Sequence, residues 1–308
     1  MIVALAGGVG AARFLDGLTR VVPPQDVFVI GNTGDDAEIH GLSISPDLDT
    51  VAYTLAGLAN PVHGWGLRGD TFHNLAALGR LGADTWFQLG DRDLATHIFR
   101  TERLRAGAKL SDVTGEITVA LGVKSRIVPM SDDPVRTMVE TKAGLLDFQD
   151  YFVRRRTRDA VREVRFHGAE RAKPAAGVLN AIMHAEAVVI CPSNPIISIG
   201  PILAVPGIRQ ALERRRGPTV AISPIVGGRA LKGPAAKMMR GLKMSVSALG
   251  VAQFYKGIVN VFVLDHQDEK QAAKIESLGM RAIVTDTIMS GLSKKKALAR
   301  AVMRSCVT

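Results

Sequence analysis

Near its start the chain carries Ile2-Val3-Ala4-Leu5-Ala6-Gly7-Gly8-Val9-Gly10, and the pattern of this stretch indicates the fold class. Its apolar run predicts a short buried strand, and its glycines predict a tight turn into a helix. An amphipathic stretch follows over 11–21, and Val27 to Ile30 then predicts a second buried strand. Strand, glycine turn, helix and strand form a βαβ unit, which is typical of an α/β protein with a parallel sheet.

The rest of the chain extends this sheet and interrupts it once. Helical spacing of apolar residues recurs over 49–58, 71–81, 94–104 and 110–121. Alternation over 135–141 and in parts of 148–166 predicts antiparallel hairpins. Further strands are expected over 188–190, 220–222, 259–264 and 281–285. We therefore predict a single Rossmann-like domain over 1–308, with helices on both faces of a parallel sheet and a helical and antiparallel insertion at about 125–172.

Composition and charge narrow the class of protein. Of the 308 residues, 47% are hydrophobic but only 5% are aromatic, so aliphatic side chains must fill the core, as in sheets covered on both faces. The formal net charge of +10 favours an anionic partner. Two cysteines are too few for a disulfide framework, and no apolar run approaches the roughly 20 residues that cross a bilayer. We expect a cytoplasmic protein with no membrane partner.

The glycine turn is the first of several polar loops expected at the carboxyl ends of strands, where ligands bind in open α/β sheets. Gly7, Gly8 and Gly10 let the backbone approach a phosphate, and the helix that follows presents free N–H groups to it. Arg13 stands where a dinucleotide fingerprint has its third glycine, and no Walker A lysine follows. The turn predicts phosphate binding, with a plain strand-to-helix turn as the alternative.

Acidic residues follow the second strand and open the next helix. The segments are Asn32-Thr33-Gly34-Asp35-Asp36 and Ser45-Pro46-Asp47-Leu48-Asp49-Thr50. Their carboxylates suit Mg²⁺, although a solvated turn and an ordinary helix start with Ser at the N-cap and Pro at N1 are the alternatives. Like charges gathered beside a phosphate loop need neutralising, so the acids predict a divalent cation between them.

Two later segments add polar groups to the same edge of the sheet. Leu89-Gly90-Asp91-Arg92-Asp93-Leu94-Ala95-Thr96-His97 offers Arg92 as a phosphate clamp. Asp93 and His97, four residues apart on one helical face, predict a surface ion pair more readily than a metal site. Cys191-Pro192-Ser193-Asn194-Pro195 and Ser198-Ile199-Gly200-Pro201-Ile202 follow another strand, and their hydroxyls and amide suit an anionic or nucleotide ligand.

In this order, and together with Gly64-Trp65-Gly66, Asp70-Thr71 and Ser131-Asp132-Asp133, these motifs resemble the 2-phospho-L-lactate transferase (phosphoenolpyruvate transferase) family of deazaflavin coenzyme F(420) biosynthesis. The resemblance implies transfer of the 2-phospholactyl, or enolpyruvyl-phosphate, group from a guanosine-diphosphate-linked donor. The acceptor would be the ribityl hydroxyl of 7,8-didemethyl-8-hydroxy-5-deazariboflavin (Fo), with GMP released and the phosphodiester of coenzyme F(420)-0 formed. It further implies a Mg²⁺-dependent enzyme of the EC 2.7.8 type and a homodimer.

The resemblance also implies roles for single residues. The family holds the deazaflavin through the aspartate of Asp-Leu-Asp-Thr, here Asp49, and through the residue before Leu-Gly-Asp-Arg-Asp, which is often basic but is Gln88 here. Because phosphoryl transfer needs alignment and charge neutralisation, we assign catalysis to Asp49, Arg92 and Asp35, and deazaflavin binding to Asp49, Gln88 and Asp91. Mg²⁺ is assigned to Asp35, Asp36, Asp47 and Asp49, and the nucleotide and its phosphates to Gly7, Gly8, Gly10, Asn32, Ser193, Asn194, Ser198 and Gly200.

Three rival functions remain in view. A sugar-nucleotide-binding metabolic regulator of the related gluconeogenesis-factor family would share the fold and the glycine loop, but would bind without turnover. A nicotinamide-dependent oxidoreductase would need a cleaner glycine fingerprint and one ribose-binding acid about 20 residues on. Nucleic-acid binding rests on the net charge and on scattered runs at 154–156, 214–216 and 294–296, which solvated faces also explain, so we expect no nucleic-acid partner. The role of the basic segment Arg154 to Arg165 is open.

Overall fold

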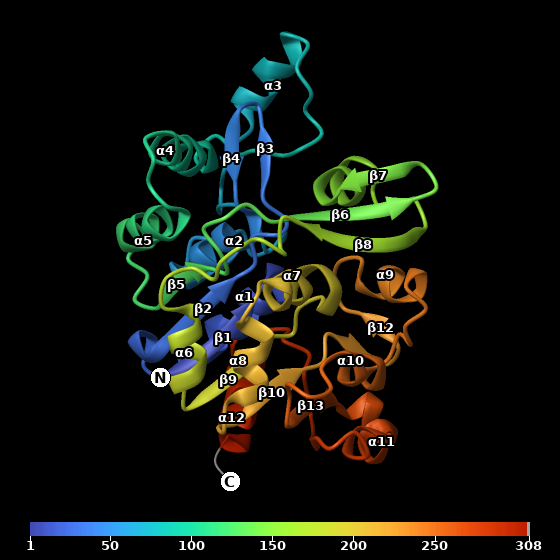
Figure 1. Ribbon diagram of the computed structural model, residues 1–308. Helices are drawn as coiled ribbons and strands as arrows, with labels where there is room; N and C mark the ends of the chain where they lie inside the picture. Colours follow the sequence, from blue (N-terminus) through green and yellow to red (C-terminus); the bar gives the residue numbers. More distant parts are fainter. Residues whose placement is uncertain (307–308) are drawn as a thin grey trace.

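A seven-stranded parallel sheet forms the centre of the computed structural model, which describes residues 1–306 (Figure 1). The strands run in the order β14-β13-β10-β9-β1-β2-β5, and every neighbouring pair is parallel. They are β1 (Ile2–Ala6), β2 (Val27–Gly31), β5 (Arg126–Pro129), β9 (Ala187–Ile190), β10 (Thr219–Ile222), β13 (Val261–Asp265) and β14 (Arg281–Thr285). The predicted Rossmann-like α/β class is confirmed.

The direction of winding changes beside β1, which lies inside the sheet. From β1 the chain winds outward to β2 and β5, whereas β10, β13 and β14 extend the sheet beyond β9 on the other side. Leu5 pairs with Ile30 of β2 on one side and with Ile190 of β9 on the other. Loops that leave the sheet at such a reversal diverge and open a crevice at the carboxyl ends of the strands. The glycine turn after β1 therefore lies at the switch point.

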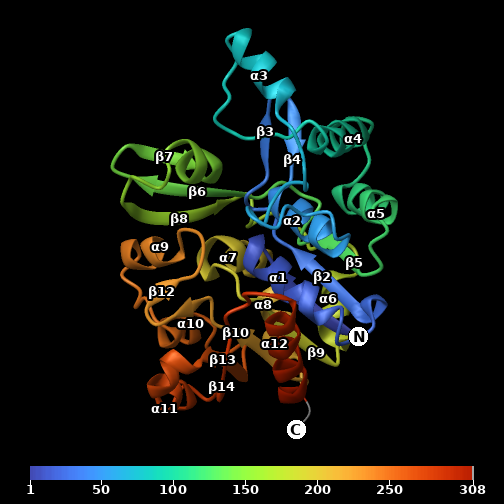
Figure 2. The same cartoon turned by 180° about the vertical axis from the view of Figure 1, so that it is seen from behind.

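Helices cover both faces of the sheet (Figures 1 and 2). Ile2 and Ala4 face α1 (Gly8–Leu18), α2 (Pro46–Leu55) and α12 (Leu292–Ser305) in one apolar cluster. Val3 and Leu5 face a second cluster with α6 (Val178–His184), α8 (Ile208–Arg214) and α10 (Ala248–Phe254). Since successive side chains of a strand point to opposite faces, two covered faces demand the unbroken apolar runs seen in the sequence.

Shorter elements complete the central unit. They are α5 (Leu110–Ala120), α7 (Gly200–Ala204), α9 (Ala235–Gly241), α11 (Ala272–Glu276), the short helices η1 (Pro24–Asp26), η3 (Pro195–Ile199) and η4 (His266–Gln271), and the hairpin β11 (Ile225–Val226) to β12 (Arg229–Ala230). In residues 1–306, no single helix is both long and apolar enough to cross a membrane, although the bent pair Pro195–Ala204 and Ile208–Arg214, at 88°, meets the criteria of length and composition.

A three-stranded antiparallel sheet stands beside the central sheet (Figure 1). Its strands β6 (Arg136–Thr141), β7 (Gly144–Asp147) and β8 (Val161–His167), with the π-helix η2 (Asp150–Arg154), match the predicted hairpins. Strand β5 falls inside the range 125–172 expected for the insertion, yet it pairs with β2 as an edge of the central sheet. The antiparallel part therefore begins at Arg136.

An arm, defined as residues 59–92, rises above the central sheet and carries α3 (His73–Arg80), which has no buried residue (Figures 1 and 2). Below it lie α4 (Asp93–Arg105) and the hairpin β3 (Ala37–Ile39) to β4 (Leu42–Ile44). Helices predicted over 71–81 and 94–104 are confirmed as α3 and α4. The hairpin was not predicted, because two three-residue strands carry too little alternation to detect.

Candidate functional site

The glycine turn packs so closely against two other loops that side chains are excluded from it. A Cβ at Gly7 would stand 2.7 Å from Asp47 Oδ2 and 2.7 Å from Ser198 Cβ. A Cβ at Gly10 would stand 2.2 Å from the carbonyl oxygen of Pro192. Helix α1 starts at Gly8, and not at Ala11 as the sequence pattern indicated, so its first turn contains the glycines. Its amino end is thereby presented at the switch point.

Polar side chains from three segments surround Gly7. The side-chain amide of Asn32 donates to Asp47 Oδ2 at 2.9 Å and to the carbonyl of Ile197 at 3.2 Å. Ser193 Oγ donates to the carbonyl of Gly7 at 2.8 Å. The structure thus brings together the predicted nucleotide-site residues Gly7, Gly8, Asn32, Ser193 and Ser198.

Two predicted nucleotide-site residues support the loop from within. Asn194 Oδ1 accepts from the backbone N–H of Ile196 at 3.0 Å and caps η3. A Cβ at Gly200 would stand 2.8 Å from the Phe166 ring, so this glycine allows β8 to approach α7. These contacts shape the loop after β9.

Three carboxylates lie beside the turn, of which Asp35 and Asp47 are buried and Asp36 is half-buried. Burial, and then the charges of Asp47 and Asp36, raise the pKa of Asp35 well above its ordinary value. Burial raises the pKa of Asp36 to about 7, although Ser45 Oγ donates to Asp36 Oδ2 at 2.7 Å and so opposes the shift. Burial likewise raises the pKa of Asp47 to about 6. The Oδ1 atoms of Asp35 and Asp36 are buried and make no hydrogen bond within the chain, which leaves two acceptor oxygens without a partner.

Asp49 is engaged by a different partner. Arg100 Nη1 donates to Asp49 Oδ2 at 3.1 Å, and Arg100 Nη2 bonds to Asp49 Oδ1. Each oxygen of this carboxylate therefore accepts one bond from the guanidinium. In residues 1–306, no three His, Cys, Asp or Glu side chains are arranged to hold a metal ion. The predicted four-aspartate set is thus divided, with Asp35, Asp36 and Asp47 on one side and the Asp49–Arg100 pair on the other.

Asp93 and His97 form a buried pair, so the prediction of a surface ion pair was wrong. His97 is 2% exposed, and its Nε2 lies 3.4 Å from Asp93 Oδ1. Tyr53 OH donates to the same Asp93 oxygen at 2.6 Å. Sequence reasoning overlooked Tyr53 and the role of Arg100, although Asp93, His97 and Arg100 follow the i, i+4, i+7 spacing of one helical face.

At the base of the arm, Asp91 accepts hydrogen bonds at the start of α3, and Asp70 accepts them at the start of α4. Asp91 accepts from Thr71 Oγ1 at 2.6 Å and from the N–H groups of His73 and Asn74, each at 2.9 Å, and these bonds lower its pKa to about 2. Asp70 in turn accepts from the N–H groups that start α4, at 2.8 and 3.1 Å. Asp91, which is predicted to bind deazaflavin, accepts from the N–H groups that start α3.

The other predicted residues of this region lie on the surface of the arm. Arg92 Nη1 donates to the carbonyl of Arg68 at 3.2 Å, and Gln88 is exposed. Both remain open to a ligand. A small cavity of about 40 Å³ lies between the arm and α4, where Trp65, Phe72 and Asp93 are among its lining residues.

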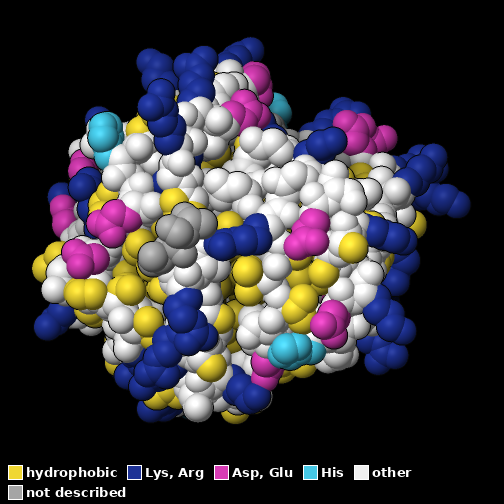
Figure 3. Space-filling model, turned by 90° about the horizontal axis from the view of Figure 1, so that it is seen from below, with side chains coloured by type: hydrophobic (Ala, Val, Ile, Leu, Met, Phe, Trp, Pro, Cys, Tyr) yellow, Lys and Arg dark blue, Asp and Glu magenta, His cyan; other side chains and the backbone are white. Residues whose placement is uncertain are grey.

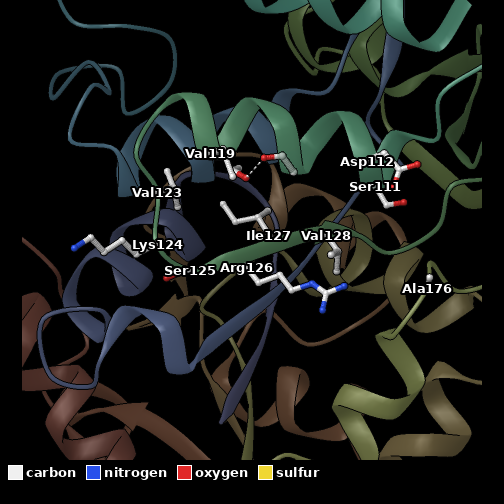
Figure 4. Close-up of a pocket in the computed structure, with 12 residues that line it drawn as sticks. Ser111, Asp112, Val119, Val123, Lys124, Ser125, Arg126, Ile127, Val128 and Ala176 are labelled. Carbon is white, nitrogen blue, oxygen red and sulfur yellow. Dashed lines mark hydrogen bonds between the residues drawn. The ribbon is translucent and has the colours of Figure 1, made fainter. Parts of the chain in front are cut away.

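A larger cavity of about 520 Å³ lies along β5 at the sheet edge (Figure 4). Ser111 and Asp112 line it from α5, and Lys124 and Arg126 from the segment that contains β5. None of the predicted site residues is part of its lining. This cavity is separate from the site at the glycine turn.

The basic runs are divided among pairs and separate groups. Arg155 Nε lies 2.7 Å from Asp159, Arg165 Nη2 lies 2.8 Å from Glu163, and Arg154 Nη2 lies 3.7 Å from Asp84 of the arm. Figure 3 shows Lys and Arg in several groups on the face seen from below, with hydrophobic side chains between them. On that face, apolar side chains divide the basic groups, and this pattern is typical of a solvated surface.

Comparison with known proteins gives consistent results over the whole chain. The sequence profile described as "2-phospho-L-lactate transferase CofD" matches residues 2–304. A 2-phospho-L-lactate transferase of Methanosarcina mazei is 40% identical over 304 residues, covering 99% of this chain and all of that protein. A phosphoenolpyruvate transferase of Streptomyces griseus is 44% identical over 307 residues, covering 97% of this chain and 96% of that protein.

A solved structure supports the fold. A crystal structure of a UPF0052 family protein from Bacillus halodurans superposes with a TM-score of 0.62, at 17% identity and over 98% of both chains. At that identity the likeness concerns the fold alone. The sequence matches carry the assignment further, because they span nearly all of the chain at about 40% identity. The chain belongs to the 2-phospho-L-lactate transferase family, and its activity is of the transferase type that gives the family its name.

Proposed function

We propose that this protein transfers a 2-phospholactyl or enolpyruvyl-phosphate group from a guanosine-diphosphate-linked donor to the ribityl hydroxyl of Fo, releasing GMP and forming coenzyme F(420)-0. The observation that carries the proposal is the cluster of Asn32, Asp47, Ser193 and Ser198 around Gly7 at the switch point of the sheet. Relatives named for either three-carbon acid are similarly close, so both donors are included. The proposal includes a homodimer that acts in the cytoplasm.

The donor diphosphate is assigned to the glycine turn. The amino end of α1, an 11-residue helix, offers free N–H groups and a partial positive charge to an anion. Two neighbouring cations, Lys232 and Arg13, support this assignment. Lys232 Nζ donates to the carbonyl of His63 at 3.2 Å, and partial burial and then the charge of Arg13 lower the pKa of Lys232. Neighbouring cations of this kind favour a bound polyanion.

Magnesium is assigned to Asp35 and Asp47, with Asp36 beside them. Asp35 and Asp47 are buried and Asp36 is half-buried, and Asp35 and Asp36 each have an oxygen without a hydrogen bond. Such carboxylates fit the hard oxygen ligands that Mg²⁺ takes in proteins. Bound there, the ion would supply charge neutralisation for the diphosphate. Asp49 leaves the proposed ligand set, because the Arg100 guanidinium already balances its charge.

The chemical step forms one bond and breaks one. The acceptor oxygen bonds to the phosphorus that carries the three-carbon acid, the bond from that phosphorus to the GMP oxygen breaks, and the hydroxyl proton passes to a base. We assign the hydrogen bond from the hydroxyl to Asp49, since a carboxylate has about four lone-pair sites and Arg100 uses two. Arg92 is assigned to the charge that develops on the transferred group.

The stability of the protein is expected to fall as the pH rises from about 4 to about 7 in the absence of divalent cations. The folded-state pKa values of Asp36 and Asp47, about 7 and about 6, lie above the unfolded value near 3.9. The folded state therefore binds more protons, and its advantage is lost as those protons leave. Millimolar Mg²⁺ should restore the melting temperature at pH 7 and above but not at pH 5. Melting curves at pH 5 and pH 7, with and without Mg²⁺ and with calcium-free buffers throughout, test this expectation. An equal effect of Mg²⁺ on the melting temperature at both pH values contradicts it.

The reaction itself is tested with purified protein, Fo, Mg²⁺ and either guanylylated donor, followed by mass spectrometry. We expect a product of Fo plus phospholactate or phosphoenolpyruvate, an equal amount of GMP, and loss of both on addition of a chelator. Tight binding of a sugar nucleotide, with no product from either donor, would instead favour the metabolic-regulator alternative.

A further inference from the structure

We propose that Arg100 and His97 are positioning residues, which fix the Asp49 carboxylate from helix α4 before the acceptor binds. The inference rests on the role proposed above for Asp49 at the acceptor hydroxyl. It concerns side chains that do not themselves touch substrate, and it explains why so many charged groups are buried between α2 and α4.

Arg100 is held on several sides. It is 2% exposed, and besides its two bonds to Asp49 its Nη1 lies 3.4 Å from the carbonyl of Ser43 in β4 and 3.3 Å from His97 Nδ1. Asp49 is the largest source of the raised pKa of Arg100, and Asp36 and Tyr53 add to it. A two-pronged guanidinium in this setting allows the Asp49 carboxylate one orientation.

His97 joins this pair to a second carboxylate. Its Nδ1 lies 3.7 Å from Asp49 Oδ2, and its Nε2 lies 3.4 Å from Asp93 Oδ1. Asp93 is fixed by Tyr53 OH, which also bonds to Thr96 Oγ1 at 2.8 Å. Since Asp93 lines the small cavity below Trp65 and Phe72, a continuous polar chain runs from that cavity to Asp49.

Helix α4 is itself anchored where these side chains leave it. Thr101 Oγ1 donates to the carbonyl of His97 at 2.6 Å and accepts from the N–H of Ser43 at 2.8 Å. Movement of α4 relative to β4 would therefore break bonds at both residues. The anchoring gives Arg100 a fixed base from which to orient Asp49.

Stability alone is a weak reason for such a pair. Removing two charges from water costs several kcal/mol, and well-packed hydrophobic residues can often replace a buried ion pair without loss. A site that must hold an ionised carboxylate in one geometry gains directly, because a misplacement of about 1 Å can cost roughly 10²-fold in rate. The network supplies that geometry to Asp49.

The first test compares Arg100→Lys with Arg103→Lys. Lysine keeps the charge at position 100 but loses the two-pronged geometry. We expect kcat to fall roughly 10- to 100-fold, with the KM for the donor changed less than about threefold. Arg103, on the same helix, forms an exposed pair with Glu116 at 2.6 and 2.9 Å, and its variant should match the wild type. An unchanged kcat, or a rise in the KM for the donor as large as the fall in kcat, overturns the inference.

The second test is a double-mutant cycle with Asp49→Asn, Arg100→Gln and both together. If Arg100 acts only through Asp49, the double variant should lose no more activity than Asp49→Asn alone, and it should be more stable than either single variant. Losses that multiply overturn the inference. A wild-type protein that neither binds nor converts Fo overturns the proposed function and this inference with it, whereas an active wild type with multiplying losses overturns the inference alone.

Discussion

Asp49→Asn is expected to lower turnover by roughly 10²–10⁴ and to destabilise the fold by roughly 3–5 kcal/mol. The loss of turnover follows because an amide is a much weaker base than a carboxylate toward the acceptor hydroxyl. The loss of stability follows because the variant leaves the buried Arg100 guanidinium without its counter-charge. The sequence does not predict this loss of stability, because nothing in it pairs Asp49 with Arg100.

Unfolding in urea and kcat at saturating donor and acceptor measure the two effects separately. Asp112→Asn is the matched control, because Asp112 also lies in the first turn of a helix, α5, but is exposed. It should leave both quantities close to those of the wild type. Wild-type turnover in Asp49→Asn, measured below its melting temperature, would remove Asp49 from the mechanism.

Gly10→Ala is expected to lower kcat/KM for the donor more than about 100-fold and to destabilise the fold by at least 1–3 kcal/mol. The new methyl group would lie 2.2 Å from the carbonyl oxygen of Pro192. That oxygen belongs to the backbone and cannot rotate away, so the loop after β9 must separate from the amino end of α1. Ser193, which bonds to Gly7, would move with it.

Gly115→Ala provides the control for this substitution. Gly115 lies in α5, and a Cβ there would meet no atom within 4 Å. Since alanine is the better helix former by roughly 0.5–1 kcal/mol, this variant should be slightly more stable and fully active. Donor binding by calorimetry and thermal unfolding compare the two variants. Normal donor affinity in Gly10→Ala would contradict the tight packing of the two loops.

Much of the fold was predictable because its signals are local. Apolar runs and helical periodicity marked the central strands and α3, α4 and α5 to within a few residues. The hairpin from Ala37 to Ile44 was not predicted. Its turn depends on the left-handed backbone of His40 and Gly41, and its strands have only three residues each. The place of β5 in the central sheet was not predicted, because its partner strand, β2, lies about a hundred residues earlier in the chain.

The candidate site was predictable in part for a related reason. The carboxyl ends of parallel strands meet at one edge, so Gly7, Asn32 and Ser193 could be expected together from strand order alone. What Asp49 and Asp91 contact could not be predicted. Asp49 finds Arg100 51 residues later, and Asp91 is committed to Thr71 and its neighbours 20 residues earlier. Spacing along a sequence does not show which of several carboxylates will form structural contacts within the folded chain.

Because β1 lies between β2 and β9 in the sheet, its two edges gain their partner strands at different times during synthesis. β2 emerges soon after β1, but Ile190, the partner of Leu5 on the other side, follows about 185 residues later. At a synthesis rate of roughly 5–20 residues per second, one edge of β1 stays unpaired for roughly 10–40 s. During that interval a row of unpaired backbone groups on an apolar strand is exposed to other chains. The strand that carries the glycine turn is therefore also the stretch of the nascent protein most in need of protection from aggregation.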